Sequence, residues 1–133
     1  MKKLSLIIAT YNRAQSLLRT LRSVVSQSAA PELWECIVVN NNSTDNTAEV
    51  FACFAAENQG FDLRMVTEVK QGLSNARNAG ITASKGEYVA IVDDDETLED
   101  SFVESYIEFF DAVPAAMAAG GAVKACYESQ RPK

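Results

Sequence analysis

Short apolar segments alternate with longer segments of mixed polarity along the chain. Four of the apolar segments are rich in β-branched residues, which is typical of buried strands in a parallel sheet. The segments between them place apolar or small residues on one face at helical spacing, which predicts helices. We expect strands at residues 4–9, 36–39, 63–66 and 88–92, and helices between Asn12 and Pro31, between Asp45 and Gly60, over residues 73–84, and after Thr97.

Capping residues indicate where the helices begin. Asn12 is a candidate cap for the first helix, and Ser43-Thr44-Asp45 offers N-cap side chains for the second. Thr97, with Asp100 three residues later, resembles a capping box before the fourth helix. That helix is expected to bury Phe102, Tyr106, Phe109 and Val113, and the third helix to pack closely on the sheet through Ala76, Ala79, Gly80 and Ala83.

The alternation of strand and helix predicts an α/β fold, with a mostly parallel sheet and helices on its faces. The 133 residues form a single domain without an internal repeat or linker. Residues 115–119 are expected to finish the fourth helix or to enter a strand, and residues 120–123 to form an edge or crossing strand. Because residues 129–133 complete no element, we expect the chain to be a truncated part of a larger domain.

The formal net charge of -6 is unevenly distributed. Residues 1–92 carry nine Lys and Arg against eight Asp and Glu, whereas Asp93 to Asp111 contains nine acids and no base. Nucleic-acid binding is therefore not expected, because phosphate backbones require a basic surface. The acid-rich segment needs a bound cation, a solvated helix face, or both.

The composition narrows the chemistry and the location. Without histidine, a metal site must rely on carboxylates, which favours Mg²⁺ or Mn²⁺. Cys36, Cys53 and Cys126 match no zinc or redox spacing, so we expect buried thiols in a reducing compartment. The apolar stretch from Leu4 to Ala9 is too short for a secretory signal, and no apolar run is long enough to cross a bilayer. A cytoplasmic location is expected.

Polar residues follow three of the four predicted strands. The carboxyl ends of parallel strands meet at one end of a sheet, where ligands bind near a topological switch point. Each polar segment also precedes a helix, whose N-terminal amides are able to receive anionic groups. The three segments are Thr10-Tyr11-Asn12-Arg13, Asn40-Asn41-Asn42-Ser43 and Asp93-Asp94-Asp95-Glu96.

The acidic segment is a candidate metal site. Asp93 and Asp95 are two residues apart after a strand, so both side chains can share a divalent ion that bridges a diphosphate. The same pattern also suits a solvated turn before an acidic helix start. Other candidates also have purely structural explanations. Tyr11 can be a partly buried aromatic residue and Arg77 a solvated side chain, and turn or cap roles are possible for Asn41, Asn42 and Ser43.

Four segments, in matching order and spacing, resemble the family 2 glycosyltransferases, which have a GT-A-type fold. The resemblance covers about residues 4–125 and implies transfer of a sugar from a nucleoside-diphosphate sugar, with UDP as the default nucleotide and usually with inversion. The segments that carry it are Leu6 to Arg13, Ile37 to Thr47, Gly72 to Ile81 and Gly86 to Glu96.

The resemblance also implies roles for individual residues. It puts the nucleotide pocket at the Thr-Tyr-Asn segment, an arginine near the base, and the metal on the Asp-x-Asp acids. Asn40 to Asn42 stand where the family usually has aspartate, which leaves GDP and dTDP open beside UDP. The implied nucleotide-sugar-binding residues are Thr10, Tyr11, Asn12, Arg13, Asn40, Asn42, Arg77, Asp93 and Asp94, and the implied Mn²⁺ or Mg²⁺ ligands are Asp95 and Asp93.

The resemblance places the general base and the acceptor site in the second half of the enzyme, so we assign no catalytic base in this chain. Glu128 is the only acid after Asp111, and nothing in its setting recommends it. Apolar surface that the second half would cover is expected to be exposed and to promote self-association.

Other classes of protein remain as alternatives. The segment Val92 to Thr97 also fits the strand-Asp-x-Asp-x-Thr pattern of haloacid dehalogenase-like phosphatases, with Asp93 as nucleophile and Asp95 as acid/base. That motif usually follows the first strand, whereas about ninety residues precede it here. A module that binds a nucleotide sugar without catalysis is the non-enzyme alternative. A dinucleotide oxidoreductase is not favoured, because this sequence has no glycine-rich turn after the first predicted strand.

Overall fold

A computed structural model describes residues 1–121 and confirms the predicted α/β architecture. Four parallel strands form one sheet in the order β3-β2-β1-β4. The strands are β1 (Leu4–Thr10), β2 (Trp34–Asn40), β3 (Leu63–Thr67) and β4 (Tyr88–Asp93), and the helices are α1 (Ala14–Val24), α2 (Thr47–Glu57), α3 (Leu73–Ala83) and α4 (Phe102–Ala112), with a short 3-10 helix η1 (Pro31–Leu33) before β2.

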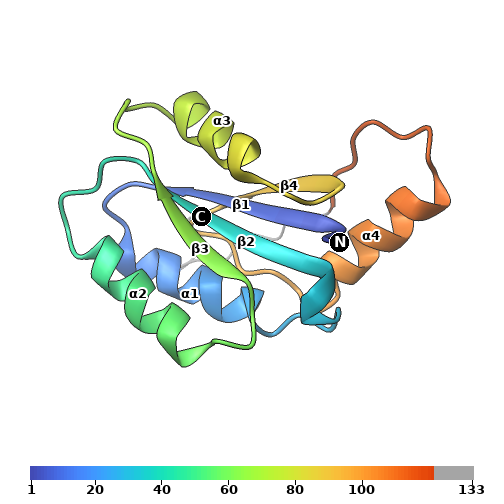
Figure 1. Cartoon of the computed structure of the whole chain (residues 1–133), viewed down its shortest axis with the longest axis horizontal. Helices are drawn as coiled ribbons and strands as arrows, with labels where there is room; N and C mark the ends of the chain where they lie inside the picture. Colours follow the sequence, from blue (N-terminus) through green and yellow to red (C-terminus); the bar gives the residue numbers. More distant parts are fainter. Residues whose placement is uncertain (122–133) are drawn as a thin grey trace, which may run out of the picture.

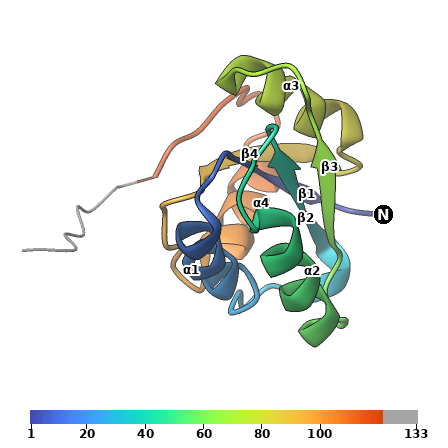
Figure 2. The ribbon, with the colours of Figure 1, turned by 90° about the vertical axis from the view of Figure 1, so that its left-hand side faces the viewer.

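The sheet separates two apolar cores. Helix α3 covers one face, and α1, α2 and α4 cover the other (Figures 1 and 2). Successive residues of β1 serve the two cores in turn, since Leu6 and Ile8 belong to the larger core and Ile7 to the smaller. The predicted close packing of α3 is confirmed: Ala76 and Gly80 are buried, and a Cβ at Gly80 would collide with Ile7.

The predicted buried face of the fourth helix was wrong. The structure buries Val103 and Ile107, whereas Phe109 and Val113 are each 42% exposed and Phe102 and Tyr106 are half-buried. The predicted capping box was also wrong, because Thr97 lies in a loop and α4 begins at Phe102. Apolar residues occupy adjacent stripes of this helix, so periodicity alone did not reveal which stripe meets the core.

Smaller corrections concern caps, cysteines and the tail. Asn12 does not cap α1, whose N-cap is Arg13, because Asn12 adopts a left-handed backbone with φ 51. Cys36 is buried, and burial raises its pKa to about 12, but Cys53 is exposed on α2. Residues 115–119 form neither helix nor strand. Cys126, Glu128 and the end of the predicted strand at 120–123 lie outside the described residues.

The strand order determines where a ligand can bind. From β1 the chain passes to β2 and β3 on one side of it, and then crosses to β4 on the other side. The strand order therefore reverses beside β1, between its neighbours β2 and β4, and such a switch point is where open α/β sheets bind ligands. The register pairs Thr10 with Asn40 and Ala9 with Asp93, so the three predicted polar segments do meet at this end of the sheet.

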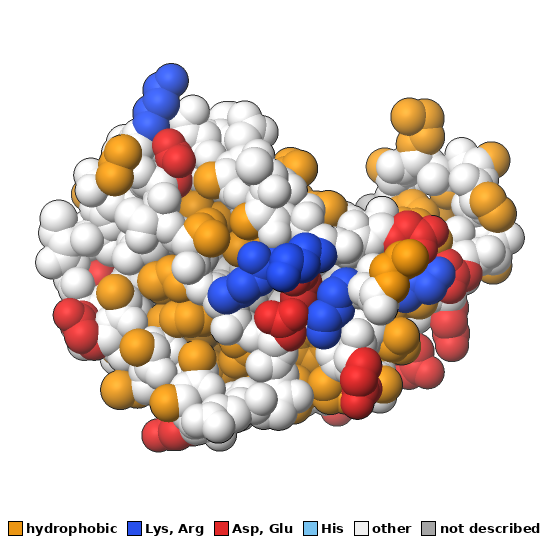
Figure 3. All heavy atoms as spheres, viewed as in Figure 1, with side chains coloured by type: hydrophobic (Ala, Val, Ile, Leu, Met, Phe, Trp, Pro, Cys, Tyr) orange, Lys and Arg blue, Asp and Glu red, His pale blue; other side chains and the backbone are white. Residues whose placement is uncertain are grey.

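A second polar cluster lies at the opposite, amino end of the sheet. The side chain of Glu35 on β2 is fully buried, and its carboxylate accepts hydrogen bonds from Ser5 Oγ at 2.6 Å, the Lys85 amide at 2.7 Å and Arg64 Nη2 at 2.7 Å. The Gly86 amide in turn donates to Ser5 Oγ at 2.8 Å. In Figure 3, basic and acidic side chains also lie side by side over the middle of the molecular face shown.

Candidate functional site

The candidate site is the carboxyl end of the sheet, where the segments after β1, β2 and β4 converge. Asn12 joins the first two of these segments. Its backbone N–H donates to Ser43 Oγ at 3.0 Å, and its side-chain Oδ1 accepts from the backbone N–H groups of Thr44 at 2.7 Å and Asp45 at 3.2 Å. The left-handed backbone of Asn12 turns its side chain into the neighbouring loop. Asn12 is thus committed to shaping the site.

Asp45 stabilises the starts of α1 and α2. Its carboxylate accepts from the Thr47 amide at 3.0 Å and from the Thr47 hydroxyl. The Thr47 hydroxyl is the main cause that lowers the pKa of Asp45, and the amides of Thr47 and Ala14 contribute further. The N-cap chemistry predicted for this segment is therefore supplied by Asp45, one residue before the N-cap position Asn46.

The three asparagines after β2 have different roles. Asn40 accepts a hydrogen bond from the Ser43 amide at 3.0 Å, which closes a turn. Asn41 is buried and holds the loop before α3: it donates to the carbonyls of Glu68 at 2.8 Å and Lys70 at 3.0 Å. Asn42 is exposed and has a left-handed backbone with φ 66. Of the three, Asn42 is the one whose side chain is open to a ligand.

Asp94 points inward although its neighbours are exposed. It is 8% exposed and accepts from Thr10 Oγ1 at 2.9 Å and from Arg13 Nη1 at 3.4 Å. Its carbonyl accepts from Ser16 Oγ at 2.9 Å. Burial raises the pKa of Asp94, and the charge of Asp95 adds to that effect, while Thr10 and Arg13 oppose it. Thr10 and Asp94 therefore tie β4 to β1 and α1 beneath the site surface.

The carboxylates of Asp93 and Asp95 are open to solvent. Their side chains are 55% and 58% exposed. Asp93 pairs with Arg77 Nη2 at 3.4 Å, and Asp95 with Arg13 Nη1 at 3.5 Å. Arg77 also has a buried Nε without a hydrogen-bond partner among the described residues. Each exposed acid thus faces one arginine across a long contact that a ligand can replace.

Glu96 adds a third carboxylate that the sequence analysis did not assign. Its Oε1 accepts from the Asp93 amide at 3.4 Å. Burial is the main cause that raises the pKa of Glu96, and the charges of Asp93 and Asp95 raise it further. Its position directly after the Asp-x-Asp pattern was the only signal in the sequence.

The donor chemistry of this turn fits a divalent cation that arrives with a phosphate ligand. Within residues 1–121 no group of three or more Asp, Glu, Cys or His side chains is arranged as a metal site. Mg²⁺ in phosphate-processing sites is usually held by one or two carboxylates together with substrate phosphates. The two exposed carboxylates Asp93 and Asp95 match that smaller donor set.

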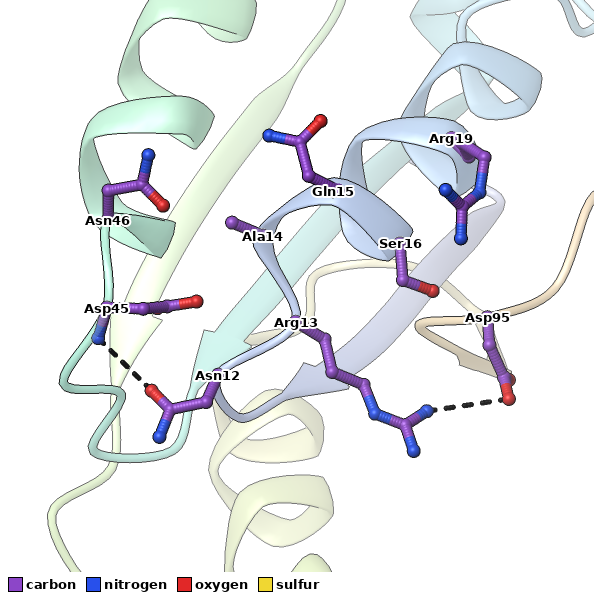
Figure 4. A pocket seen from close by; sticks show the side chains of 9 residues that line it. All are labelled: Asn12, Arg13, Ala14, Gln15, Ser16, Arg19, Asp45, Asn46 and Asp95. Atoms are coloured by element: carbon purple, nitrogen blue, oxygen red, sulfur yellow. Dashed lines mark hydrogen bonds and ion pairs between the residues drawn. The ribbon is translucent and has the colours of Figure 1, made fainter.

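A hollow of about 520 Å³ overlaps one side of the site, since Asn12, Arg13 and Asp95 are among its lining residues. Figure 4 shows the side chain of Arg13 between the start of α1 and Asp95, with Asn12 and Asp45 on the far side of the hollow. Tyr11, Asn42, Arg77 and Asp93 are not among its lining residues. The predicted site is therefore an open surface along the strand ends, and Arg13 and Asp95 form its border with the hollow.

The parallel sheet and its flanking helices have the arrangement of GT-A-type glycosyltransferase structures. The chain belongs to glycosyl transferase family 2, whose family model matches residues 5–133. The poly-beta-1,6-N-acetyl-D-glucosamine synthase of Staphylococcus epidermidis is 36% identical over 119 residues, which are 89% of this chain and 28% of that protein. The glycosyltransferase YibD of Escherichia coli is 36% identical over 106 residues, 77% of this chain and 29% of that protein. The chain thus spans less than a third of the length of these two relatives.

Solved structures agree with the family assignment. The structure of S. aureus TarS in complex with UDP has a TM-score of 0.74 and 25% identity, over 83% of this chain and 32% of that chain. The mannosyltransferase PcManGT from Pyrobaculum calidifontis, in complex with GDP-Man and Mn²⁺, has a TM-score of 0.78 and 24% identity, over 81% of this chain and 32% of that chain. The second likeness establishes the fold alone.

Proposed function

We propose that this chain is the donor-binding part of a glycosyltransferase that uses a nucleoside-diphosphate sugar and a divalent cation. The observation that carries the proposal is the pair of exposed carboxylates, Asp93 and Asp95, at the switch point of the sheet. Among the described residues, the ion pairs of these two carboxylates are the long contacts to Arg77 and Arg13, at 3.4 and 3.5 Å.

The surface around these acids suits the remaining parts of the donor. Tyr11 is 47% exposed and presents a ring on which a base can stack. Arg77 lies beside Asp93, and its side chain is 38% exposed, so its positive charge is within reach of a ligand. Asn42 adds an amide that both donates and accepts, and Asn12 and Asn40 hold the loops that carry it. We therefore propose Tyr11, Asn42 and Arg77 for the nucleoside.

Asp93 and Asp95 would hold Mn²⁺ or Mg²⁺ together with the diphosphate. When bound, such an ion neutralises the charge that develops on a departing phosphate. Asp94 keeps the acidic turn in position through Thr10 and Arg13. Arg13 lies beside the same oxygens and supplies positive charge for the anionic donor.

UDP is the first nucleotide to test, because TarS, whose structure resembles this chain, was solved with UDP. Inversion at the anomeric carbon is a further part of the proposal that rests on family membership. We expect the general base and the acceptor site in residues beyond the matched segment, since the chain spans less than a third of its relatives. Family membership leaves the phosphatase alternative without support.

Location and self-association stay predictions. No helix in the described part of the chain is long and apolar enough to cross a membrane. A cytoplasmic location would be tested by cell fractionation. Val89 and Ile91 on β4 are 40% and 42% exposed, which is the apolar surface from which self-association is predicted.

Calorimetric titration of the chain with UDP, GDP and dTDP, each with and without Mn²⁺, tests the proposal. We expect one nucleotide to bind in a Mn²⁺-dependent manner and Asp95→Asn to weaken that binding by about tenfold or more. Asp100→Asn is the matched control, because Asp100 is an exposed acid on the loop before α4. Equal binding by both variants would remove Asp95 from the metal site, and turnover of a donor would exclude a module that only binds.

A further inference from the structure

We propose that Arg13 is a displaceable counter-charge at the acidic turn: it competes with the cation for Asp95 before the donor binds, and attracts the diphosphate afterwards. The inference rests on the proposed function. It adds that Arg13 weakens binding of the cation and strengthens binding of the diphosphate at the same site. It follows from the geometry of the contacts that Arg13 makes with Asp94 and Asp95.

One guanidinium nitrogen is shared between the two acids. Arg13 Nη1 lies 3.4 Å from Asp94 Oδ1 and 3.5 Å from Asp95 Oδ2. Both distances exceed those of a well-formed N–H···O hydrogen bond. The nitrogen therefore sits between two carboxylates without a tight bond to either, and moving away from one carboxylate costs little.

The two contacts differ in exposure, which decides which of them breaks first. The side chain of Asp94 is 11% exposed, and that of Asp95 is 58% exposed. An ion pair between exposed groups is weak because water competes for both partners. A cation that binds Asp95 therefore displaces the outer contact, while the contact to Asp94 keeps Arg13 beside the site.

The backbone of Arg13 keeps its side chain within reach throughout. Arg13 is the N-cap residue of α1, and its carbonyl accepts from the Leu17 amide at 2.9 Å. Figure 4 shows its side chain reaching from that position toward Asp95. Since the helix start fixes the backbone, only the outer part of the side chain has to move when the carboxylate is taken.

The charge of Arg13 acts with opposite sign on the two ligands. A positive group a few ångströms from Asp95 repels a divalent cation and attracts a diphosphate. Removal of the charge should therefore tighten Mn²⁺ binding in the absence of nucleotide and weaken binding of the nucleotide once Mn²⁺ is present. A purely structural role of Arg13 would instead weaken both, because a loosened turn binds each ligand less well.

The test compares Arg13→Gln with Arg13→Lys and Arg22→Gln at low salt. The free Mn²⁺ signal in electron paramagnetic resonance gives the affinity for the ion alone, and calorimetry with UDP at saturating Mn²⁺ gives the affinity for the nucleotide. Arg22 is exposed on the last turn of α1, roughly 14 Å along the helix axis, and controls for the loss of one charge.

We expect Arg13→Gln to bind Mn²⁺ about fivefold more tightly and UDP about tenfold more weakly than the unaltered chain. Arg13→Lys and Arg22→Gln should stay close to the unaltered chain in both measurements. Unchanged or weaker Mn²⁺ binding by Arg13→Gln would overturn the inference while leaving the proposed function intact. Absence of Mn²⁺ binding by the unaltered chain, with and without UDP, would overturn the metal-dependent function and this inference together.

Discussion

Charged side chains gather at both ends of the same four strands, but those at the amino end are enclosed and those at the carboxyl end are open. Glu35 at the amino end is fully buried, and three donors bind its carboxylate at 2.6 to 2.7 Å. Asp93 and Asp95 at the carboxyl end are more than half exposed, and their arginine partners lie at 3.4 and 3.5 Å. The first cluster is complete without a ligand, whereas the second leaves oxygens free for one.

The two ends also differ in how the fold treats negative charge. Burial alone would raise the pKa of Glu35, but hydrogen bonds from Ser5, Lys85 and Arg64 outweigh burial and hold that pKa below its ordinary value. At Asp94 burial prevails, and the pKa is raised. The fold thus stabilises the charged form of Glu35 and disfavours the charged form of Asp94. Acids kept at such a cost are typical of functional sites.

The largest expected effect is the loss of the charge at the amino end. Glu35→Gln should lower the free energy of unfolding by about 3 kcal/mol, because one amide NH₂ would then face the donors of Arg64. Urea denaturation measures the change, with Glu57→Gln on the exposed surface of α2 as control. A loss below about 1 kcal/mol would mean that the buried carboxylate contributes little to stability.

The stability of Glu35→Gln should depend less on acidic pH than the stability of the unaltered chain. Because the pKa of Glu35 is lowered in the folded state, its contribution is present above the unfolded value near 4.3 and is lost as pH falls through the folded pKa. The unaltered chain should therefore lose stability below about pH 4 more steeply than Glu35→Gln. Parallel curves for the two proteins would contradict the assigned shift.

A somewhat smaller loss of stability is expected from a substitution at Gly86, whose backbone packs against Ser5 at the amino end of the sheet. A Cβ on Gly86 would lie 2.6 Å from the Ser5 amide nitrogen, so Gly86→Ala must shift β1 or the segment before β4. We expect a loss of about 2 kcal/mol in the free energy of unfolding. Gly60→Ala is the matched control, since a Cβ there meets nothing within 4 Å. Equal stability of the two variants would show that the amino end tolerates rearrangement.

The sequence predicted the elements and the carboxyl end better than the amino end, for a physical reason. Buried strands and polar strand ends are local patterns, and parallel pairing alone brings the polar ends together. The Glu35–Arg64 pair depends instead on how β2 is aligned with β3, with Ile37 opposite Arg64. Charged residues at the starts of two apolar strands were a signal for such a pair, but nothing local specified the alignment.

Orientation within the site was equally hard to predict. Consecutive acids in a turn have no fixed alternation, so the inward direction of Asp94 follows from its contact with Thr10 rather than from spacing. In α4, Phe102, Val103, Tyr106 and Ile107 offer two adjacent apolar stripes. The structure buries Val103 and Ile107, and the periodicity of the helix does not distinguish their stripe from the neighbouring one.

Asp94→Asn replaces a buried carboxylate by an amide at the carboxyl end of the sheet, as Glu35→Gln does at the amino end, but we expect it to change stability least. Asp94→Asn should alter the free energy of unfolding by no more than about 0.5 kcal/mol at neutral pH. The amide oxygen can still accept from Thr10, and the substitution removes a buried charge whose pKa is raised. The lost contact is the long one to exposed Arg13, which is worth little.

The pH dependence gives this variant a second readout with the opposite sign to Glu35. Because the folded pKa of Asp94 is raised, its ionisation removes stability as pH rises from its unfolded value near 3.9 through the folded pKa. Asp94→Asn should lack that decline, so its stability relative to the unaltered chain should increase as pH rises above about 4. A loss above about 1.5 kcal/mol at neutral pH would instead make Asp94 a structural ion like Glu35, and the contrast between the two ends would then be confined to Asp93 and Asp95.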